Sequence, residues 1–254
     1  ERPDDALAAC DKALALRPDL AEAWLGRGNA LAEQGRCDEA LAAYDKALVL
    51  GPRLAMAWLG RGNAFSKLKL LDEALMAHGR ALALKPDLAE AWLGRGNVFA
   101  ELERYDEAVA AYDKALAAKP GLAEAWIGRG DVFMAMERHG EALAAYDSAL
   151  ALKPDHVALE GLRLRARQNI CDWDGFEADC SHLIESVANN KPSTDPFTFL
   201  SLASRGTDQH NCARLWIDRR HPAVKPPLWN GEIYRHDKVR VGYVSADFQE
   251  HATA

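Results

Sequence analysis

The sequence lacks the features that mark several classes of protein. It contains no apolar run near the roughly 18 residues that a membrane-spanning helix needs, and its first residues, ERPDDALAAC, show no signal-peptide pattern. A net charge of −7 provides no cationic field for nucleic acid or an anionic membrane surface. A P-loop, a G-x-S-x-G elbow and a glycine-rich phosphate cradle are also missing. We therefore expect a cytoplasmic protein that binds neither nucleic acid nor membranes.

Cysteine is scarce, and its spacing excludes two further classes. The five residues form no C-x-x-C pair, so neither a disulfide framework nor a zinc site is indicated. We expect buried thiols at Cys10, Cys37, Cys171, Cys180 and Cys212. Asp247, Glu250 and His251 lack the spacing of a known metal site, so we predict no metal.

The most prominent feature of the sequence is a repeat of 34 residues, marked by Trp24, Trp58, Trp92 and Trp126. Glycine recurs at the eighth place of each unit, alanine at the twentieth and twenty-seventh, and proline at the thirty-second. This pattern resembles the tetratricopeptide repeat. Whole units occupy residues 21–54, 55–88, 89–122 and 123–156, and residues 1–20 fit the second half of another unit. We expect a longer array that begins before residue 1.

The spacing of small and large residues predicts the fold of this region. Small residues at the eighth, twentieth and twenty-seventh places allow two antiparallel helices to approach closely, and the tryptophan fills the gap between successive units. Proline at the thirty-second place ends the second helix, because it pushes the preceding residue out of the α region. We predict an all-α protein, with residues 1–156 forming a right-handed superhelix of repeats, an α-solenoid.

The first helix of each unit is expected to line the concave face of the superhelix. Its second place holds glutamate in three units and its fifth place holds leucine or isoleucine. Its ninth place holds Asn29, Asn63, Asn97 and Asp131. An asparagine that repeats at one place is suited to grip the backbone of an extended peptide, because its side chain both donates and accepts hydrogen bonds. Capping of neighbouring loops is the equal alternative, so these four residues are candidate contacts for protein or peptide partners.

Arginine recurs at the seventh place, where leucine is commoner in such repeats. A buried guanidinium requires a carboxylate partner, and Asp45, Asp113 and Asp147 share one phase that suits this role. We interpret the four arginines mainly as part of a structural ion-pair ladder and only secondarily as a ligand site: Arg27, Arg61, Arg95 and Arg129.

Beyond Pro154 the repeat decays. Residues 157–188 still carry two amphipathic helices, broken near CDWDGF, with Trp173 and Phe176 in the core positions of a capping repeat. Residues 189–237 are richer in proline and form a linker with short helices expected at 196–204 and 207–219. Residues 238–254 begin with a short apolar run, VRVGYV, which predicts a buried parallel strand of an α/β domain whose other strands are not in this sequence.

The order of these elements resembles the protein O-GlcNAc transferase family, including its bacterial and SPINDLY-like members. The resemblance rests on the repeats, the CDWDGF unit, the KPPLW segment and the terminal VRVGYVSADFQEHATA. It implies that residues 238–254 open the first Rossmann-like lobe of a glycosyltransferase of the GT-B type. It also implies that His251 stands where the family has its active-site histidine, a proposed general base.

That family sets further expectations and one departure. The complete enzyme would use a nucleotide sugar, UDP-GlcNAc, to glycosylate serine or threonine, whereas residues 1–254 alone would hold no cofactor and be inactive. Animal members carry an asparagine ladder at the sixth place, but this chain has glycine there: Gly26, Gly60, Gly94 and Gly128. The sixth-place residues of this chain therefore cannot bind a peptide as that asparagine ladder does, and we assign this role to the ninth-place asparagines as a hypothesis.

Two alternatives remain beside the O-GlcNAc transferase interpretation. The chain is suited to a protein-interaction scaffold without enzymatic activity, or to the repeat region of a SPINDLY-like O-fucosyltransferase that uses GDP-fucose. A homo-oligomer is compatible with each.

Overall fold

The structure of the chain is a computed structural model that describes residues 3–220, except 155, 157–158, 192–193 and 203. The chain divides into two units, Glu1–Trp216 and Ile217–Ala254, and only residues 217–220 of the second are described. Thirteen α-helices and no strand occur in this described part. The predicted strand at 239–244, the KPPLW segment and His251 all lie outside it.

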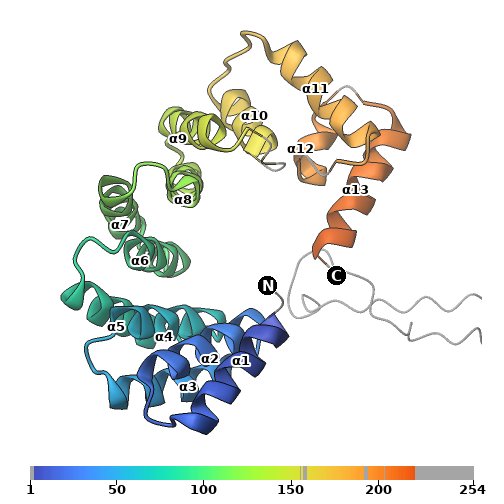
Figure 1. Cartoon of the computed structure of the whole chain (residues 1–254). Helices are drawn as coiled ribbons and strands as arrows, with labels where there is room; N and C mark the ends of the chain where they lie inside the picture. The colour runs from blue at the N-terminus through green and yellow to red at the C-terminus, as the bar shows by residue number, and fades with distance from the viewer. Residues whose placement is uncertain (1–2, 155, 157–158, 192–193, 203, 221–254) are drawn as a thin grey trace, which may run out of the picture. The chain divides into compact units, whose positions relative to one another are not determined.

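The helices follow the 34-residue period of the sequence (Figure 1). Helix α1 (Pro3–Leu16) belongs to the half repeat, and the four whole repeats each supply two helices. The first helices are α2 (Ala21–Glu33), α4 (Ala55–Lys67), α6 (Ala89–Glu101) and α8 (Ala123–Ala135). The second helices are α3 (Cys37–Leu50), α5 (Leu71–Leu84), α7 (Tyr105–Ala118) and α9 (His139–Leu152). The remaining helices are α10 (Leu159–Asn169), α11 (Phe176–Ala188), α12 (Pro196–Leu200) and α13 (Gly206–Arg220).

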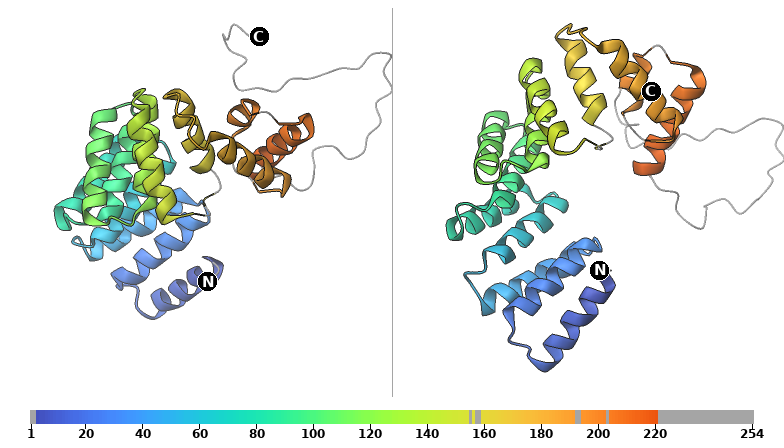
Figure 2. Two further views of the ribbon diagram at one scale, coloured as in Figure 1. Left: turned by 90° about the horizontal axis from the view of Figure 1, so that it is seen from above. Right: turned by 45° about the horizontal axis from the view of Figure 1, so that its top comes forward.

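Each repeat packs as a helix pair, and the pairs stack in chain order (Figure 2). The first helices of adjacent repeats contact one another, so α2, α4, α6 and α8 form one continuous face. Alanines fill the interface inside each pair; Ala108, Ala111 and Ala115, for example, are buried around Tyr112. The all-helical repeat fold expected from the sequence is confirmed for the described residues.

The ends of the helices have local causes. Each second helix stops two residues before the repeat's proline, and the residue between them lies outside the α region, as at Lys119 with φ −146° and ψ 88°. The turn inside each repeat carries a residue with positive φ, a glycine at Gly35 (φ 78°) but Lys69, Glu103 and Glu137 in the next three repeats. Backbone hydrogen bonds close this turn, such as Arg104 N–H to Phe99 O at 2.9 Å.

The repeat tryptophans are partly buried and pack against the cores of successive repeats, as expected; Trp92 and Trp126, for example, each contact two core clusters. Each indole also donates its N–H to the carbonyl of the preceding repeat's proline, as in Trp24 Nε1 to Pro18 O at 2.9 Å. The same bond is made by Trp58, Trp92 and Trp126, with N–O distances of 3.3, 2.9 and 3.2 Å. The tryptophan therefore fixes the connection between successive repeats as well as packing against them.

Helices α10 to α13 build a separate small core at the end of the stack. Its buried side chains are Leu164, Leu183, Val187, Phe199, Leu202 and Cys212. Trp173 is 58% exposed, so its predicted core position is wrong, although it makes an edge-on contact with Phe176 at 4.9 Å between ring centroids. The expectation of five buried thiols also fails in part, because Cys171 is exposed in a turn of positive φ. Of the five free thiols, only Cys37 and Cys212 are buried.

Candidate functional site

The ninth-place residues line a groove along the face made by the first helices. Asn29 in α2, Asn63 in α4 and Asn97 in α6 are all exposed and all border one cavity of about 510 Å³. We call this cavity the inner groove. The other side chains and backbone segments around it belong to Ala32, Glu33, Tyr44, Met56, Leu59, Gly60, Ala64, Ser66, Lys67 and Gly94.

Two of the asparagines, Asn29 and Asn97, are held by tyrosines from the second helix of their own repeat. The Tyr44 hydroxyl donates to Asn29 Oδ1 at 3.0 Å, and the Tyr112 hydroxyl donates to Asn97 Oδ1 at 2.9 Å. Because the side-chain oxygen is occupied, each amide offers its N–H donors, which have no partner among the described residues. The oxygens of Asn29 and Asn97 thus bind tyrosine hydroxyls and do not cap neighbouring loops. Peptide binding by these residues stays a prediction.

The ring of each tyrosine explains the glycines at the sixth and eighth places. A Cβ on Gly28 in the same repeat would lie 2.5 Å from the Tyr44 ring, and a Cβ on Gly60 in the next repeat would also lie 2.5 Å from it. Two glycines therefore make the slot for the Tyr44 ring, and Gly96 and Gly128 do the same for Tyr112, so a side chain at the sixth place of these repeats would collide with the ring. Burial raises the pKa of Tyr44 to about 12 and keeps the hydroxyl protonated as a donor.

The second repeat breaks this arrangement, because His78 stands where the other repeats have tyrosine. The imidazole is fully buried between Gly62 and Gly94, and neither ring nitrogen has a hydrogen-bond partner. Burial, with a smaller contribution from the charge of Arg95, lowers its pKa to about 4. The ring makes no hydrogen bond to Asn63, so both the oxygen and the amide nitrogen of Asn63 are available to the inner groove.

A second cavity of about 370 Å³ continues the groove toward α8. It is lined by Asn97, Ala100, Tyr105, Tyr112, Gly128, Asp131, Val132 and Ala135. Asp131 takes the ninth place here and accepts a hydrogen bond from the Tyr146 hydroxyl at 2.7 Å. An ionised carboxylate can only accept, so this pair also shows that the tyrosine hydroxyl is the donor in the series.

Other charged groups beside the groove are mostly paired. Glu90 and Glu124, at the second place, bind Lys119 and Lys153 of their own repeats. Lys67 donates to the carbonyl of Ala32 at 3.0 Å, at the end of α2. These contacts remove Glu90 and Glu124 as free ligand groups and leave the ninth-place row as the main repeating set of available polar side chains.

The seventh-place arginines other than Arg95 form the predicted ion-pair ladder, and each of them binds a carboxylate of the previous repeat. Arg61 lies 3.0 Å from Asp45 and Arg129 lies 2.9 Å from Asp113. The ladder begins at Arg27 with Asp11 (2.9 Å) and continues into α10 at Arg163 with Asp147 (2.7 Å). The sequence interpretation assumed buried arginines, but their side chains are about one quarter exposed. Each guanidinium also lies over a tryptophan ring, as Arg61 does over Trp58 at 5.3 Å from the ring centroid.

Arg95 is the exception in this ladder. The residue in the matching position of the preceding repeat is Gly79, so Arg95 has no carboxylate partner in the described structure, and its buried Nε makes no hydrogen bond. Burial lowers its pKa. The second repeat thus differs from its neighbours at two adjacent positions, His78 and Gly79.

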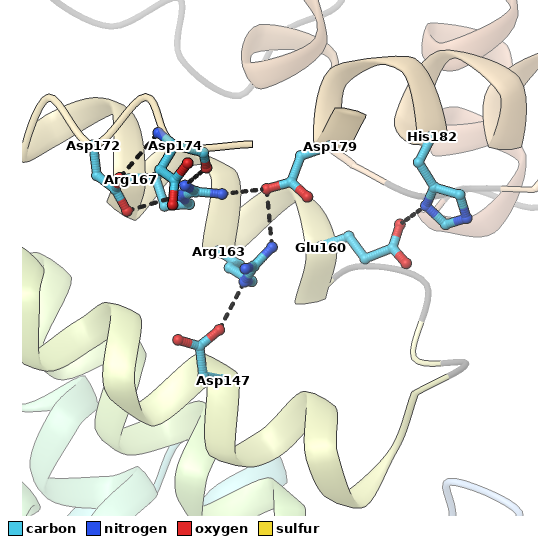
Figure 3. Close-up of polar contacts among 8 residues, drawn as sticks. All are labelled: Asp147, Glu160, Arg163, Arg167, Asp172, Asp174, Asp179 and His182. Atoms are coloured by element: carbon cyan, nitrogen blue, oxygen red, sulfur yellow. Dashed lines mark hydrogen bonds and ion pairs between the residues drawn. The ribbon is translucent and has the colours of Figure 1, made fainter. Parts of the chain in front are cut away.

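The ladder ends in a cluster of ion pairs around α10 and α11 (Figure 3). Asp179 Oδ2 accepts from Arg163 at 2.9 Å and from Arg167 at 2.7 Å, and Arg167 also binds Asp172 at 3.0 Å. The hydrogen bond from Arg167 is the main cause that lowers the pKa of Asp172. Each of the two arginines and three aspartates in these pairs has a partner. We therefore interpret the cluster as ion pairs that hold α10 and α11 together and not as a ligand site.

The structure tests the remaining site predictions only in part. His251 lies outside the described residues. No group of three or more potential metal ligands occurs among residues that the structure describes. None of the described helices is long and apolar enough to cross a bilayer.

Sequence reasoning identified the ninth-place row but missed the residues that hold it. The signal was present, because Tyr44, Tyr112 and Tyr146 recur at the twenty-fourth place with the same period as the tryptophans. The substitution at His78 is visible in the same alignment.

A comparison with known protein families identifies the repeats. Residues 1–55, 33–89, 79–123 and 93–157 match the family model of the tetratricopeptide repeat. No curated protein matches the sequence.

Three solved structures illustrate the similarity of fold. The thermophilic repeat protein TTC0263 of Thermus thermophilus is 26% identical, with a TM-score of 0.57 over 67% of this chain and 91% of that one. MamA is 28% identical, with a TM-score of 0.53 over 60% of this chain and 89% of its own. YrrB, described as having an unusual peptide-binding site, is 22% identical, with a TM-score of 0.56 over 71% of this chain and 93% of its own.

Proposed function

Since this chain belongs to the tetratricopeptide-repeat family, we propose that it is a protein-interaction scaffold that binds an extended peptide segment of a partner protein in the inner groove. The observation that carries this proposal is the row formed by Asn29, Asn63 and Asn97, three exposed amides at one place of successive repeats. Tyrosine hydroxyls occupy the oxygens of Asn29 and Asn97, so their N–H donors are presented for hydrogen bonding.

The spacing of the row suits a peptide backbone. Packed helices lie about 8–10 Å apart, and an extended chain advances about 3.3 Å per residue. One asparagine therefore meets the peptide about every three residues, and backbone carbonyls are the acceptors that such a chain always provides. Leu59 and Met56 offer apolar surface between the amides. YrrB, which shares the fold, supports the idea that this architecture accommodates a peptide.

The proposal is tested by removing the amides together. We expect the triple variant Asn29→Ala, Asn63→Ala, Asn97→Ala to bind a pool of random 12-residue peptides much more weakly than the unchanged chain. Each lost hydrogen bond is worth about 1 kcal/mol, so the apparent Kd should rise about 100-fold if the three act together.

A matched control replaces two exposed asparagines outside the groove, Asn169 and Asn189, by alanine. This variant should bind the pool as the unchanged chain does, and circular dichroism should show equal helix content for all three proteins. Unaltered binding by the groove variant would show that the row is not the peptide site.

The resemblance of VRVGYVSADFQEHATA to the O-GlcNAc transferase family supports a second, more specific function. On this proposal the groove recruits acceptor proteins to a glycosyltransferase domain that starts at residues 238–254, with His251 near the acceptor hydroxyl and UDP-GlcNAc as donor. The comparisons match repeat proteins and add no support for the catalytic part, so the scaffold is the primary proposal.

The catalytic proposal is tested with the complete product of the gene that encodes this chain. We expect it to transfer radiolabelled sugar to protein from UDP-GlcNAc, or from GDP-fucose if it is SPINDLY-like. We expect His251→Ala to reduce transfer. No transfer from either donor would refute the catalytic proposal and leave the scaffold proposal intact.

A further inference from the structure

The ninth-place row changes its chemistry at Asp131. In the three preceding repeats this place holds a neutral amide, whereas Asp131 carries a carboxylate at the border of the 370 Å³ cavity. One carboxylate oxygen, Oδ1, accepts the Tyr146 hydroxyl at 2.7 Å. The other oxygen has no partner among the described residues, and the side chain is exposed.

Among the described residues, no cation forms an ion pair with Asp131. Arg129, two residues earlier on α8, is bound to Asp113 at 2.9 Å. Arg165 takes the ninth place in α10 and is exposed, but it forms no ion pair with Asp131 in the described structure. Desolvation by the surrounding atoms raises the pKa of the Asp131 carboxyl although part of the side chain reaches solvent, and the Tyr146 hydrogen bond opposes this effect. A carboxylate that is partly desolvated and unpaired favours binding of a positive group.

The walls of the cavity suit a long cationic side chain. Ala100, Val132 and Ala135 provide apolar surface for an aliphatic stem. Tyr105 and Tyr112 provide aromatic rings, to which cations are attracted. Asn97 belongs to both cavities, so a peptide backbone along the inner groove passes directly to this site.

We propose that the cavity at Asp131 is a specificity pocket for a lysine or arginine side chain of the bound peptide. The ammonium or guanidinium group pairs with the free oxygen of Asp131, while the stem lies against Val132 and Ala135. The proposal rests on the peptide-binding function proposed above and adds the chemical class of the segment that is recognised.

The experiment uses the full chain and pools of 12-residue peptides that share one fixed central residue. The fixed residue is lysine, arginine, norleucine or glutamate, and all other positions are random. Norleucine retains the aliphatic stem of lysine without its charge. Asp131→Asn is the matched variant, because it installs the residue that the three preceding repeats carry and preserves an acceptor for Tyr146. We expect the unchanged chain to bind the lysine and arginine pools about fivefold more tightly than the norleucine pool.

The variant should lose this preference and bind the lysine, arginine and norleucine pools with equal affinity. An equal preference for lysine in both proteins would overturn the proposed pocket but not the groove. If the unchanged chain binds every pool no more tightly than the triple alanine variant does, both the groove proposal and the pocket proposal are refuted. Peptides with acetylated and free amino termini are compared as well. Binding that depends only on a free terminus would assign the site to a chain end and refute recognition of a side chain.

Discussion

Replacing His78 with tyrosine should remove a pH-sensitive weakness from the second repeat. The structure provides the template, because Tyr44 and Tyr112 occupy the same position between two glycines in the neighbouring repeats. Gly62 and Gly94 flank His78 in the same way, so a tyrosine ring fits without displacing the backbone. We also expect its hydroxyl to bind Asn63, as Tyr112 binds Asn97.

The size of the effect follows from the pKa of His78, which burial lowers from 6.5 to about 4. Because the folded-state pKa lies below the unfolded-state value, the neutral ring contributes stability above pH 6.5, and that stability is lost as the pH falls toward 4. The linkage relation gives a loss of about 2 kcal/mol at pH 5 and about 3 kcal/mol below pH 4. At pH 7.5 the new hydrogen bond to Asn63 should add about 1 kcal/mol.

Urea unfolding followed by circular dichroism at pH 7.5 and pH 5.0 measures the effect. For the unchanged chain and for His78→Tyr, we take the difference in unfolding free energy between the two pH values and compare these differences. The contributions of titratable groups that both proteins share then cancel. The reciprocal variant, Tyr112→His, places the same imidazole in the third repeat and should introduce an additional pH dependence of about 2 kcal/mol.

The reasoning is refuted if His78→Tyr and the unchanged chain lose the same stability between pH 7.5 and pH 5.0. That result would mean that the imidazole is not buried without partners in solution.

Two further changes test the ion pairs. Gly79→Asp should give Arg95 the carboxylate partner that the other arginines have, and a Cβ at this position meets no atom within 4 Å. In urea unfolding, we expect this variant to be about 0.5 kcal/mol more stable than the control Gly79→Asn. The difference should disappear at about 1 M salt, because salt screens exposed charges. Asp179→Ala should cost about 2 kcal/mol, because it removes a charged acceptor from Arg167, whose side chain is only 7% exposed. Hydrogen exchange should show the loss as weaker protection of α10 and α11, whereas Glu177→Ala on the exposed side of α11 should have little effect.

Much of the repeat fold was predictable because its determinants are local and recur. Trp24 and its three equivalents gave the period, and Pro52, Pro86 and Pro120 gave the ends of second helices, since proline restricts the residue before it wherever it occurs. The arginine ladder was also predictable in phase. Its carboxylates Asp45 and Asp113 were predicted as well. The sequence did not show that each of them binds the arginine of the following repeat, Arg61 and Arg129, because that pairing depends on how adjacent repeats stack.

The structure places the ninth-place asparagines beside a cavity, and their role in binding a peptide stays a prediction. Asn29 and Asn97 were candidates for peptide binding, but the tyrosines that orient them went unnoticed. Trp173 was placed in a core because it falls on a helical phase near Phe176, yet it lies in the turn before α11 and is mostly exposed. A hydrophobic phase shows which residues can be buried, but not whether a neighbouring element is present to cover them.

The sequence by itself determined the period, the helical class and the identity of the residues at each place. These properties depend on interactions within one turn or one helix pair, and each 34-residue unit repeats them. Only the tertiary structure decided that the sixth-place glycine of one repeat receives the tyrosine of the repeat before it. Within the described residues, the tertiary structure also leaves Asp131 without an ion pair and buries His78 without a hydrogen-bond partner, because both outcomes depend on how adjacent helix pairs stack.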